Sequence, residues 1–395
     1  MSNWQELEKK YLFNNAIRWP ILPVKGKGCY LWDENGKKYL DLVGGWAVCS
    51  LGHCHPVMTK ALTNQAKKLV QCGPQSCNQP QLQLAEVLVK ISCFNRVFFT
   101  SSGAEANEGA VKLARRYGAI KLNGAFETIT TYNSFHGRTL AMTAATGQPH
   151  YQDAYKPLSV GFINVSFNDI EAIKKATTKD TCAVMVEPVQ GEGGVNIPDE
   201  GYLKAVRLWC DEKGILLILD EVQTGIGRIG TMFGYQQYGI EPDIITLAKG
   251  LGGGIPIGAF MAKEKCAVFV PGDHGGTYAS NPLMCATALA VMEYVIKHDV
   301  PGQAQKSGVY LLDGLNKLKS KYAFITDVRG RGLLAAVEFN KNLAAAIKLT
   351  CIEKGLMVND VKPNAVRVMP PLNISKQEID EALGILDQVF ADIKV

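Results

Sequence analysis

Short apolar runs alternate with longer segments of helical periodicity from about residue 56 to residue 260. Five of these runs are typical of strands: RVFFT (96–100), TITTY (128–132), CAVMV (182–186), ILLIL (215–219) and DIITLA (243–248). Amphipathic stretches such as EANEGAVKLARRYGAI lie between them and predict helices. This alternation predicts an α/β fold with a mostly parallel sheet, helices on both faces and a ligand at the carboxyl ends of the strands.

The two ends of the chain show a different pattern. Residues 24–43 contain two short apolar and aromatic runs around the turn sequence DENG (33–36), which is typical of a hairpin. The last hundred residues combine helical stretches such as LAAAIKLTCIEKG with short runs such as LAAVEF, and these indicate a smaller α+β unit. We therefore expect an N-terminal segment (1–50) that is part of a small domain, a large domain (51–295) and a C-terminal small domain (296–395).

Composition and charge exclude several classes of function. The chain has 395 residues, of which 47% are hydrophobic and 20% charged, so it can bury a large core. Its net charge of +5 is small and its lysines and arginines are dispersed, which argues against nucleic acid as a partner. No apolar run approaches the ~18 to 20 residues of a membrane span, so we expect a cytoplasmic protein without a membrane partner. The 11 scattered cysteines lack any C-x-x-C pair and indicate reduced thiols.

The stretch GHCHP (52–56) places two histidines around a cysteine, as some metal sites do. Neighbouring residues on an extended chain point to opposite sides, and no second cluster of histidine and cysteine supplies the remaining ligands. We expect a buried turn here and no metal.

One lysine stands where a buried strand is predicted to end. In DIITLAKGLGGGIPIGAF (243–260), Lys249 follows a run without polar alternation, typical of a strand buried on both faces. Its ammonium either reaches water or is kept for chemistry that uses a neutral amine, since burial lowers the pKa of a lysine. The glycines after Lys249 do not complete the G-x-G-x-x-G/A fingerprint, so a dinucleotide loop is not predicted.

Polar or small residues also follow the other four predicted strands. Ser101-Ser102-Gly103-Ala104 opens a helix and suits either a serine cap or a bound phosphate. Phe135 and Arg138 follow the second strand, and the segment 187–194 follows the third. Asp220 ends the fourth strand, where a carboxylate is costly unless a cation or a good donor meets it.

Asp220 and Lys249 admit two interpretations. They form a structural ion pair, or a bound heterocycle lies between them, with Asp220 on a protonated ring nitrogen and Lys249 joined to the ring as an imine. The second arrangement also uses the phosphate-type turn and the aromatic face of Phe135. An imine-forming lysine, an acid opposite a pyridinium nitrogen, a phosphate cradle and a stacking aromatic together describe a pyridoxal phosphate (PLP) site.

Long motifs across about residues 24–390 resemble the class III, fold type I aminotransferases and, within them, the acetylornithine aminotransferase branch. The motifs are SSGAEANEGAVKLAR, SFHGRTLAMTAATGQ, VEPVQGEGGV, LLILDEVQTGIGRIG, YGIEPDIITLAKGLGGGIPIGA, PGDHGGTYASNPL and VRVMPPL. The resemblance implies a large domain with a mostly parallel seven-stranded sheet, a smaller α+β domain and PLP as cofactor. It also implies transfer of the ω-amino group of N-acetylornithine to 2-oxoglutarate, which gives N-acetylglutamate semialdehyde and glutamate, in arginine biosynthesis.

Nine positions match cofactor-binding residues of this family: Ser102, Gly103, Ala104, Phe135, Asp220, Val222, Gln223, Lys249 and Thr277. By this resemblance Lys249 forms the Schiff base and shuttles a proton, and Asp220 bonds the pyridinium nitrogen. Gln223 bonds the ring hydroxyl, and the ring lies between the side chains of Val222 and Phe135. Residues 102–104 cradle the phosphate. Thr277 reaches the phosphate of the neighbouring subunit, which implies a homodimer with active sites at the subunit interface.

Two arginines and a glutamate select the substrate in this family. The resemblance implies that Arg138 holds the carboxylate far from the reacting amine. Arg367 holds the carboxylate next to the reacting carbon in the glutamate half-reaction, and Glu192 pairs with Arg367 when the substrate lacks that carboxylate. A guanidinium binds a carboxylate at two points, which a lysine does not do.

Departures from the family pattern leave the acyl group of the substrate open. Gly45 matches the acetylornithine branch, but Trp46 replaces an isoleucine and GPQSCNQP (73–80) lacks the usual aromatic residues. Gly276, expected near the substrate, removes a serine hydroxyl beside the acyl group. Succinylornithine, N-succinyl-diaminopimelate, ornithine and a lysine-pathway analogue are alternative substrates. A catalytically inactive PLP-binding relative, or a PLP-dependent decarboxylase or mutase, is disfavoured because the lysine, the aspartate and both arginines are present.

Overall fold

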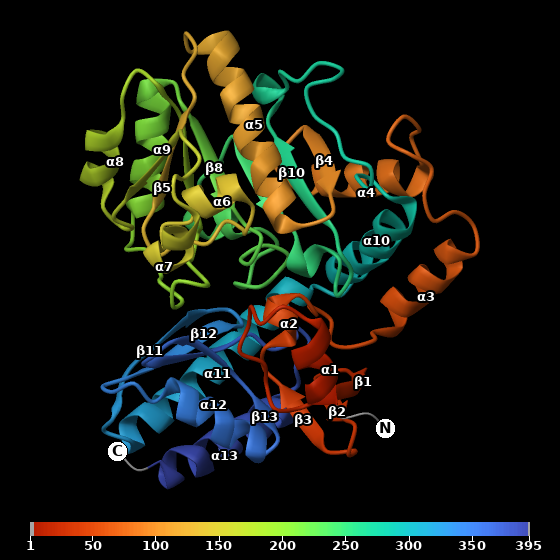
Figure 1. The fold of residues 1–395 in the computed structure, drawn as a ribbon, viewed down its shortest axis with the longest axis vertical. Helices are drawn as coiled ribbons and strands as arrows, with labels where there is room; N and C mark the ends of the chain where they lie inside the picture. Colours follow the sequence, from red (N-terminus) through yellow and green to blue (C-terminus); the bar gives the residue numbers. More distant parts are fainter. Residues whose placement is uncertain (1–3, 394–395) are drawn as a thin grey trace.

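The computed structural model describes residues 4–393 and contains three β-sheets surrounded by helices (Figure 1). None of the helices in this range is long and apolar enough to cross a membrane. The largest sheet has seven strands, which are, in spatial order, β4 (Arg96–Thr100), β10 (Gly258–Ala262), β9 (Ile244–Leu247), β8 (Leu216–Asp220), β7 (Thr181–Val186), β5 (Glu127–Thr131) and β6 (Phe162–Val165).

Six strands of this sheet run in one direction. The pairs β9–β8, β8–β7, β7–β5 and β5–β6 are parallel, whereas β10 is antiparallel to both of its neighbours, β4 and β9. The predicted mostly parallel sheet of seven strands is therefore confirmed. Because of the shared direction, the carboxyl ends of β4, β5, β7, β8 and β9 lie at one edge of the sheet.

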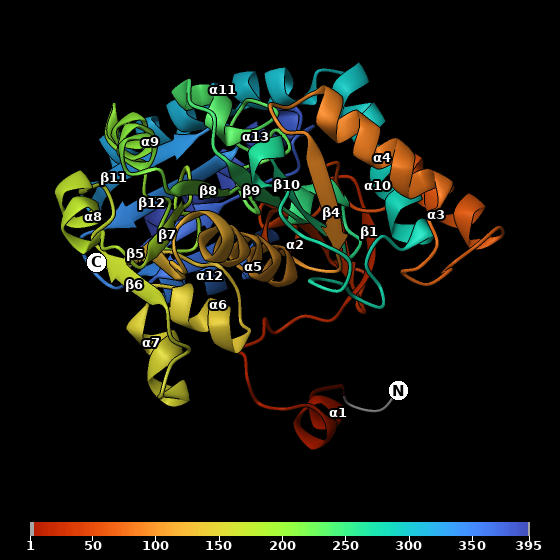
Figure 2. The ribbon, with the colours of Figure 1, turned by 90° about the horizontal axis from the view of Figure 1, so that it is seen from above.

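Both faces of the sheet are buried, and side chains alternate between them. Ala183 and Met185 of β7 pack in one cluster with residues of α5 (Gly103–Lys121), whereas Val184 and Val186 pack in another with residues of α9 (Tyr202–Lys213). Figure 2 shows α5 and α9 on opposite sides of the strands. Full burial of a side chain such as valine or methionine stabilises the folded state by about 1.5 to 3 kcal/mol. Because both faces of the sheet are buried, its strands contain no polar alternation.

The remaining helices cover the sheets or connect them. The α-helices are α1 (Trp4–Tyr11), α2 (Gly44–Ala47), α3 (Pro56–Ala66), α4 (Gln79–Lys90), α6 (Leu140–Ala145), α7 (Pro149–Gln152), α8 (Ile170–Ala176), α10 (Pro282–Lys297), α11 (Val300–Lys321), α12 (Ala344–Glu353) and α13 (Lys376–Asp392). Short 3-10 helices are η1 (Asp153–Tyr155), η2 (Gly234–Tyr238), η3 (Lys249–Leu251) and η4 (Glu264–Cys266).

The two ends of the chain share a small sheet. It has the order β1 (Pro23–Lys27), β2 (Tyr30–Asp33), β3 (Lys38–Asp41) and β13 (Leu356–Met357). The turn at residues 33–36 joins β2 to β3 as a hairpin, and β13 pairs in parallel with β3. Red and blue elements accordingly lie together at the bottom of Figure 1. The domain boundaries at residues 50 and 295 stay predictions.

The third sheet carries a residue of the candidate site. Its order is β11 (Ile325–Arg331), β12 (Leu334–Phe339), β15 (Ala365–Val368) and β14 (Asn359–Lys362), and all its strand pairs are antiparallel. All four residues of β15 are buried, and Arg367 is among them. Burial of a guanidinium requires partners. One of them, Asn359, lies on the adjacent strand β14, and the others come from segments that follow strands of the seven-stranded sheet.

Candidate active site

A cavity of about 490 Å³ lies at the carboxyl edge of the seven-stranded sheet. Segments that follow β4, β5, β7, β8 and β9 line it. The cavity brings together ten residues that the sequence predicts for the site: Ser102, Gly103, Ala104, Phe135, Arg138, Glu192, Asp220, Val222, Gln223 and Lys249.

The turn after β4 places a helix N-terminus at the cavity. Ser102 is the N-cap of α5, and its Oγ accepts a hydrogen bond of 3.2 Å from the backbone N–H of Glu105. A Cβ at Gly103 would lie 2.9 Å from Cγ1 of Val222, so a larger residue would force the turn away from its neighbour. The serine cap is therefore present, and the first N–H groups of the 19-residue helix also suit a phosphate in the cavity.

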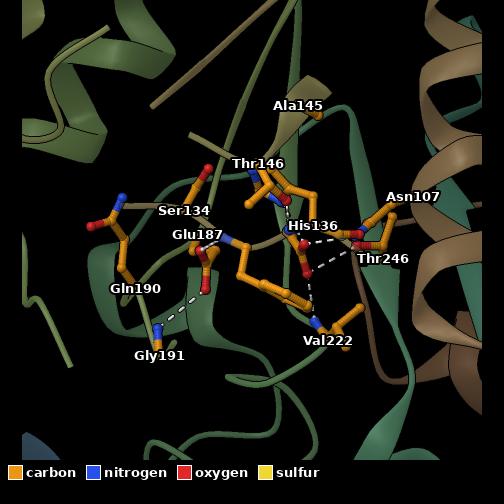
Figure 3. Close-up of polar contacts among 12 residues, drawn as sticks. Asn107, Ser134, His136, Ala145, Thr146, Glu187, Gln190, Gly191, Val222 and Thr246 are labelled. Atoms are coloured by element: carbon orange, nitrogen blue, oxygen red, sulfur yellow. Dashed lines mark hydrogen bonds and ion pairs between the residues drawn. The ribbon is translucent and has the colours of Figure 1, made fainter. Parts of the chain in front are cut away.

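Asp220 ends β8 with a carboxylate that four donors surround. Its Oδ2 lies 2.7 Å from Nδ1 of His136 and accepts a hydrogen bond of 2.8 Å from Asn107. Its Oδ1 accepts hydrogen bonds from the backbone N–H of Val222 (2.9 Å) and from Thr246 (3.4 Å). Figure 3 shows Asn107, His136, Val222 and Thr246 close to one another. Within residues 4–393 no ion pair joins Asp220 to Lys249, so the interpretation of the two as a structural ion pair is wrong.

A second buried carboxyl lies beside this network. Glu187 accepts hydrogen bonds from the backbone N–H groups of Phe135 (2.9 Å) and Gly191 (3.2 Å). Figure 3 shows the bond from Gly191. Burial raises the pKa of Glu187 to about 7; the charge of Asp220 adds to this rise and His136 opposes it. Nε2 of His136 has no partner among the described residues. Two carboxyl groups and one imidazole, all buried, thus lie together in the lining of the cavity.

Lys249 begins η3 in an unusual backbone conformation. Its φ of 39° lies in the left-handed region, which a residue with a side chain seldom adopts. Such strain concentrates at functional sites. The ammonium has no hydrogen-bond or ion-pair partner in the described part of the chain. Burial lowers the pKa of Lys249, and Arg367 adds to this effect, while the charges of Glu192 and Asp220 oppose it. An amine whose pKa is lowered is a better nucleophile at neutral pH.

Arg367 is fully buried and held by three side chains. It donates two hydrogen bonds to Oδ1 of Asn359 (2.7 and 3.1 Å) and one to Oε1 of Gln223 (3.2 Å). Its Nη2 forms an ion pair of 2.8 Å with Oε2 of Glu192. Burial alone would raise the pKa of Glu192, but the charges of Arg367 and Lys249 outweigh it and hold the pKa below its ordinary value. Glu192 therefore occupies the position on Arg367 that a substrate carboxylate would need.

Arg138 has a different environment at the rim of the same cavity. Its side chain is exposed, and its guanidinium lies 3.8 Å from the ring centroid of Tyr151 and 5.3 Å from that of Phe135. No carboxylate of residues 4–393 pairs with it. A guanidinium supported by aromatic faces and free of an anion is suited to bind the carboxylate of a ligand.

The predicted phosphate residue Thr277, the predicted substrate residue Gly276 and the unusual residue Trp46 are not among the residues that line this cavity. Gly276 and Thr277 are exposed, and the carbonyl of Thr277 accepts a hydrogen bond of 2.6 Å from Gln71. Trp46 stacks on Trp19 with ring centroids 6.0 Å apart. The role of Thr277 toward a neighbouring subunit and the effects of Gly276 and Trp46 on the acyl group stay predictions.

Asn107, His136 and Glu187, which the structure places around Asp220, have no role predicted from the sequence. Asn107 and His136 lie within the family motifs, and Glu187 directly follows a predicted strand. A polar residue on the buried side of a helix, as at Asn107, is the kind of signal that could have identified it.

The fold and the site together define a class of protein: enzymes that hold a phosphorylated aromatic cofactor through a lysine amine. Comparison with known proteins then specifies the class. A family model described as Aminotransferase class-III matches residues 13–390. The acetylornithine aminotransferases of Caldanaerobacter subterraneus subsp. tengcongensis and Methanocaldococcus jannaschii are 49% and 48% identical to this chain, over 98% and 99% of it and 99% of each relative.

Solved structures agree with this assignment. The crystal structure of the ornithine aminotransferase from Toxoplasma gondii matches with a TM-score of 0.95 and 32% identity over 98% of this chain and 94% of that one. The chain belongs to the class III aminotransferases, and its cofactor is pyridoxal phosphate.

Proposed function

We propose that this protein transfers the ω-amino group of N-acetylornithine to 2-oxoglutarate, forming N-acetylglutamate semialdehyde and glutamate in arginine biosynthesis. Acetylornithine aminotransferases that are 49% and 48% identical over nearly the full chain support the choice of this donor. The arrangement of charged groups in the cavity supports it independently.

The residues around the cavity fit PLP. The N-terminus of α5 is placed to bind the phosphate, and the apolar side chains of Phe135 and Val222 line the cavity where an aromatic ring needs support. When bound, PLP supplies a ring that withdraws electrons from the carbon bearing the amine. Asp220, held by His136, would keep a ring nitrogen of the bound cofactor protonated. The amine of Lys249, with its lowered pKa, moves a proton at the reacting carbon.

The two arginines fit the two half-reactions. N-acetylornithine has one carboxylate, far from the reacting amine, and Arg138 binds it at the rim of the cavity. Arg367 then stays paired with Glu192. 2-Oxoglutarate has a second carboxylate next to its carbonyl group, and this carboxylate binds Arg367 in place of Glu192.

The observation that carries the preference for an acylated donor is that every carboxyl group of the cavity is already engaged. Asp220 is bound by His136, Glu187 by two backbone N–H groups and Glu192 by Arg367. Free ornithine would bring a charged α-amine near Arg138 with no carboxylate to receive it. The acyl group removes that charge, because an amide nitrogen is neutral.

We further propose a homodimer in which Thr277 completes the phosphate site of the partner. Thr277 is exposed and lies outside the cavity of its own chain. The N-terminal segment also exposes large apolar side chains, of which Phe13 is 92% and Ile17 95% accessible. Such side chains suit an interface between subunits. A cytoplasmic location stays a prediction of the sequence.

Comparison of donors tests this proposal. Purified protein with PLP and 2-oxoglutarate is assayed for glutamate with N-acetylornithine, succinylornithine, N-succinyl-diaminopimelate and ornithine. We expect kcat/KM to be highest for N-acetylornithine and about tenfold or more lower for ornithine, whose α-ammonium finds no partner. If ornithine were turned over as fast as N-acetylornithine or faster, the argument from the engaged carboxyl groups would be refuted. If a succinylated donor were preferred, the substrate would be that compound and not N-acetylornithine.

A further inference from the structure

Glu192 lines two cavities. One is the cavity of about 490 Å³ that holds Lys249, and the other has a volume of about 650 Å³ and includes Asn133, His150 and Lys362 among its lining residues. The side chain of Glu192 is 22% exposed, although its carboxylate pairs with Arg367. A carboxylate that leaves Arg367 therefore has a second space beside it.

A β-bulge turns Lys362 toward this space. Asn359 of β14 pairs with Arg367 of β15, and Lys362 pairs with Ala365, with a register shift between Asp360 and Lys362. Residues 365 and 367 of a strand share one face, so the extra residue in β14 brings Lys362 onto the face that carries Asn359 and Arg367. A regular strand would have placed Lys362 on the opposite face.

Lys362 lies against the segment that bears Glu192. A Cβ at Gly194 would lie 2.6 Å from Cε and 2.9 Å from Nζ of Lys362. The backbone of this segment is fixed, because Arg329 donates hydrogen bonds to the carbonyls of Gly194 (2.7 Å) and Val195 (3.2 Å). Movement between the two cavities is therefore left to the side chain of Glu192.

The ammonium of Lys362 lacks an anion. It is half-buried and forms no ion pair with any residue of the described chain, 4–393. Asp360, the carboxylate nearest to it in β14, is bound by Lys348 at 2.6 Å. Burial lowers the pKa of Lys362 and the charge of Arg329 lowers it further, while the charge of Glu338 opposes them. Glu338 is itself paired with Arg329 at 2.7 Å, so the ammonium of Lys362 would gain from a carboxylate of its own.

We propose that Lys362 binds the carboxylate of Glu192 while a substrate carboxylate occupies Arg367. The inference rests on the proposed function, in which 2-oxoglutarate displaces Glu192. A displaced carboxylate that stayed partly buried without a cation would oppose binding of the substrate, since an uncompensated buried charge is costly. Lys362 is thus a positioning residue for the acceptor half-reaction and has no part in binding the donor.

Binding of glutarate tests this role without turnover. Glutarate has the two carboxylates of 2-oxoglutarate but no carbonyl group, so its affinity for the PLP-loaded protein can be measured by calorimetry. We expect Lys362→Met to weaken glutarate binding about tenfold, the effect of losing one hydrogen bond between charged groups. Lys362→Arg should restore the affinity, and Lys204→Met, which changes an exposed lysine on α9, should not alter it.

A double-mutant cycle identifies the partner of Lys362. In a Glu192→Gln protein there is no carboxylate to receive, so adding Lys362→Met should leave glutarate binding unchanged. An equal loss of affinity in both backgrounds would overturn the proposal, because Lys362 would then act on the ligand or on the fold. No loss with Lys362→Met alone, or no binding of glutarate to the unmodified protein, would also overturn it. The choice of donor is decided separately by the turnover comparison, so failure of one proposal is distinguishable from failure of the other.

Discussion

Oδ2 of Asp220 lies 2.7 Å from Nδ1 of His136, and both side chains are almost fully buried. The carboxylate at the end of β8 is therefore fixed by an imidazole from the segment after β5, and Lys249 at the end of the neighbouring strand is left unpaired. This division explains how one edge of the sheet holds an acid and an amine without forming an ion pair between them. The space between the two is then available to a cofactor.

Replacement of Lys249 tests whether its amine is the covalent anchor and the proton carrier. We expect Lys249→Ala to lower kcat by about 10²- to 10⁴-fold, the range for a lost general acid or base. Reduction of the PLP-loaded protein with borohydride should fix the cofactor to the peptide that contains Lys249, as detected by mass spectrometry. Lys263→Ala, which removes an ion pair with Glu241, is the control. Cofactor found on another lysine would contradict the assignment.

Replacement of Arg138 by lysine keeps the charge and removes the two-point contact. We expect Arg138→Lys to raise KM for both N-acetylornithine and 2-oxoglutarate by about 10- to 100-fold, since each presents its distal carboxylate to this guanidinium. Steady-state kinetics measure this effect, and Arg96→Lys, in an exposed pair with Glu264, is the matched control. An increase in KM for one substrate alone would show that the two substrates do not share Arg138.

Gly191 is required by the position of Gln223. A Cβ at residue 191 would lie 1.8 Å from Oε1 of Gln223, the atom that accepts a hydrogen bond from Arg367. We expect Gly191→Ala to lower the free energy of unfolding by about 1 to 3 kcal/mol through overpacking. It should also lower kcat/KM, because Gln223 must move. Gly384→Ala, where a Cβ meets no atom within 4 Å, should leave activity unchanged. Urea unfolding measures the stability and steady-state kinetics measure the activity. Unchanged stability and activity in Gly191→Ala, or lost activity in Gly384→Ala, would contradict this prediction.

The pair of His53 and Asp41 predicts how stability varies with pH. Burial lowers the pKa of His53, but hydrogen bonds with Asp41 and Cys49 outweigh this and raise it from 6.5 to about 10. Because the pKa is raised on folding, the stabilisation is fully present below about pH 6.5 and is lost as the pH rises toward 10.

Substitution of His53 separates this effect from other titrations. We expect His53→Gln to cost about 3 kcal/mol of unfolding free energy at pH 6, the order found for breaking a buried pair. The cost should fall markedly at pH 9.5. Urea unfolding at both values measures it, with His150→Gln, an exposed residue, as the control. A cost that does not vary with pH would contradict the charged state of His53.

The parts of the fold and site that local sequence patterns determine could be predicted. Apolar runs mark β4, β5, β7, β8 and β9, and the residues that end them mark the cavity, because parallel strands place their carboxyl ends together. By contrast, β6 has no fully buried residue, and β10 begins within a cluster of glycines, so neither gives a strong pattern. The reversed direction of β10 depends on pairing across the sheet, which periodicity does not encode.

Contacts between distant residues account for most of what could not be predicted. Asn107 and Asp220 are 113 positions apart, and Glu192 and Arg367 are 175 apart. The packing of α5 and of the third sheet brings these pairs together, whereas residue type suggests only that each polar group needs a partner. The left-handed backbone of Lys249 and the bulge before Lys362 are likewise consequences of tertiary structure.

The central claim is that the ω-amine of N-acetylornithine becomes the amine of glutamate. The most direct measurement uses N-acetylornithine labelled with ¹⁵N at the ω-amine, together with unlabelled 2-oxoglutarate and the PLP-loaded protein. Mass spectrometry should find the label in glutamate in a one-to-one ratio with N-acetylglutamate semialdehyde. Unlabelled glutamate, or label retained in the donor while another amine is consumed, would contradict the account.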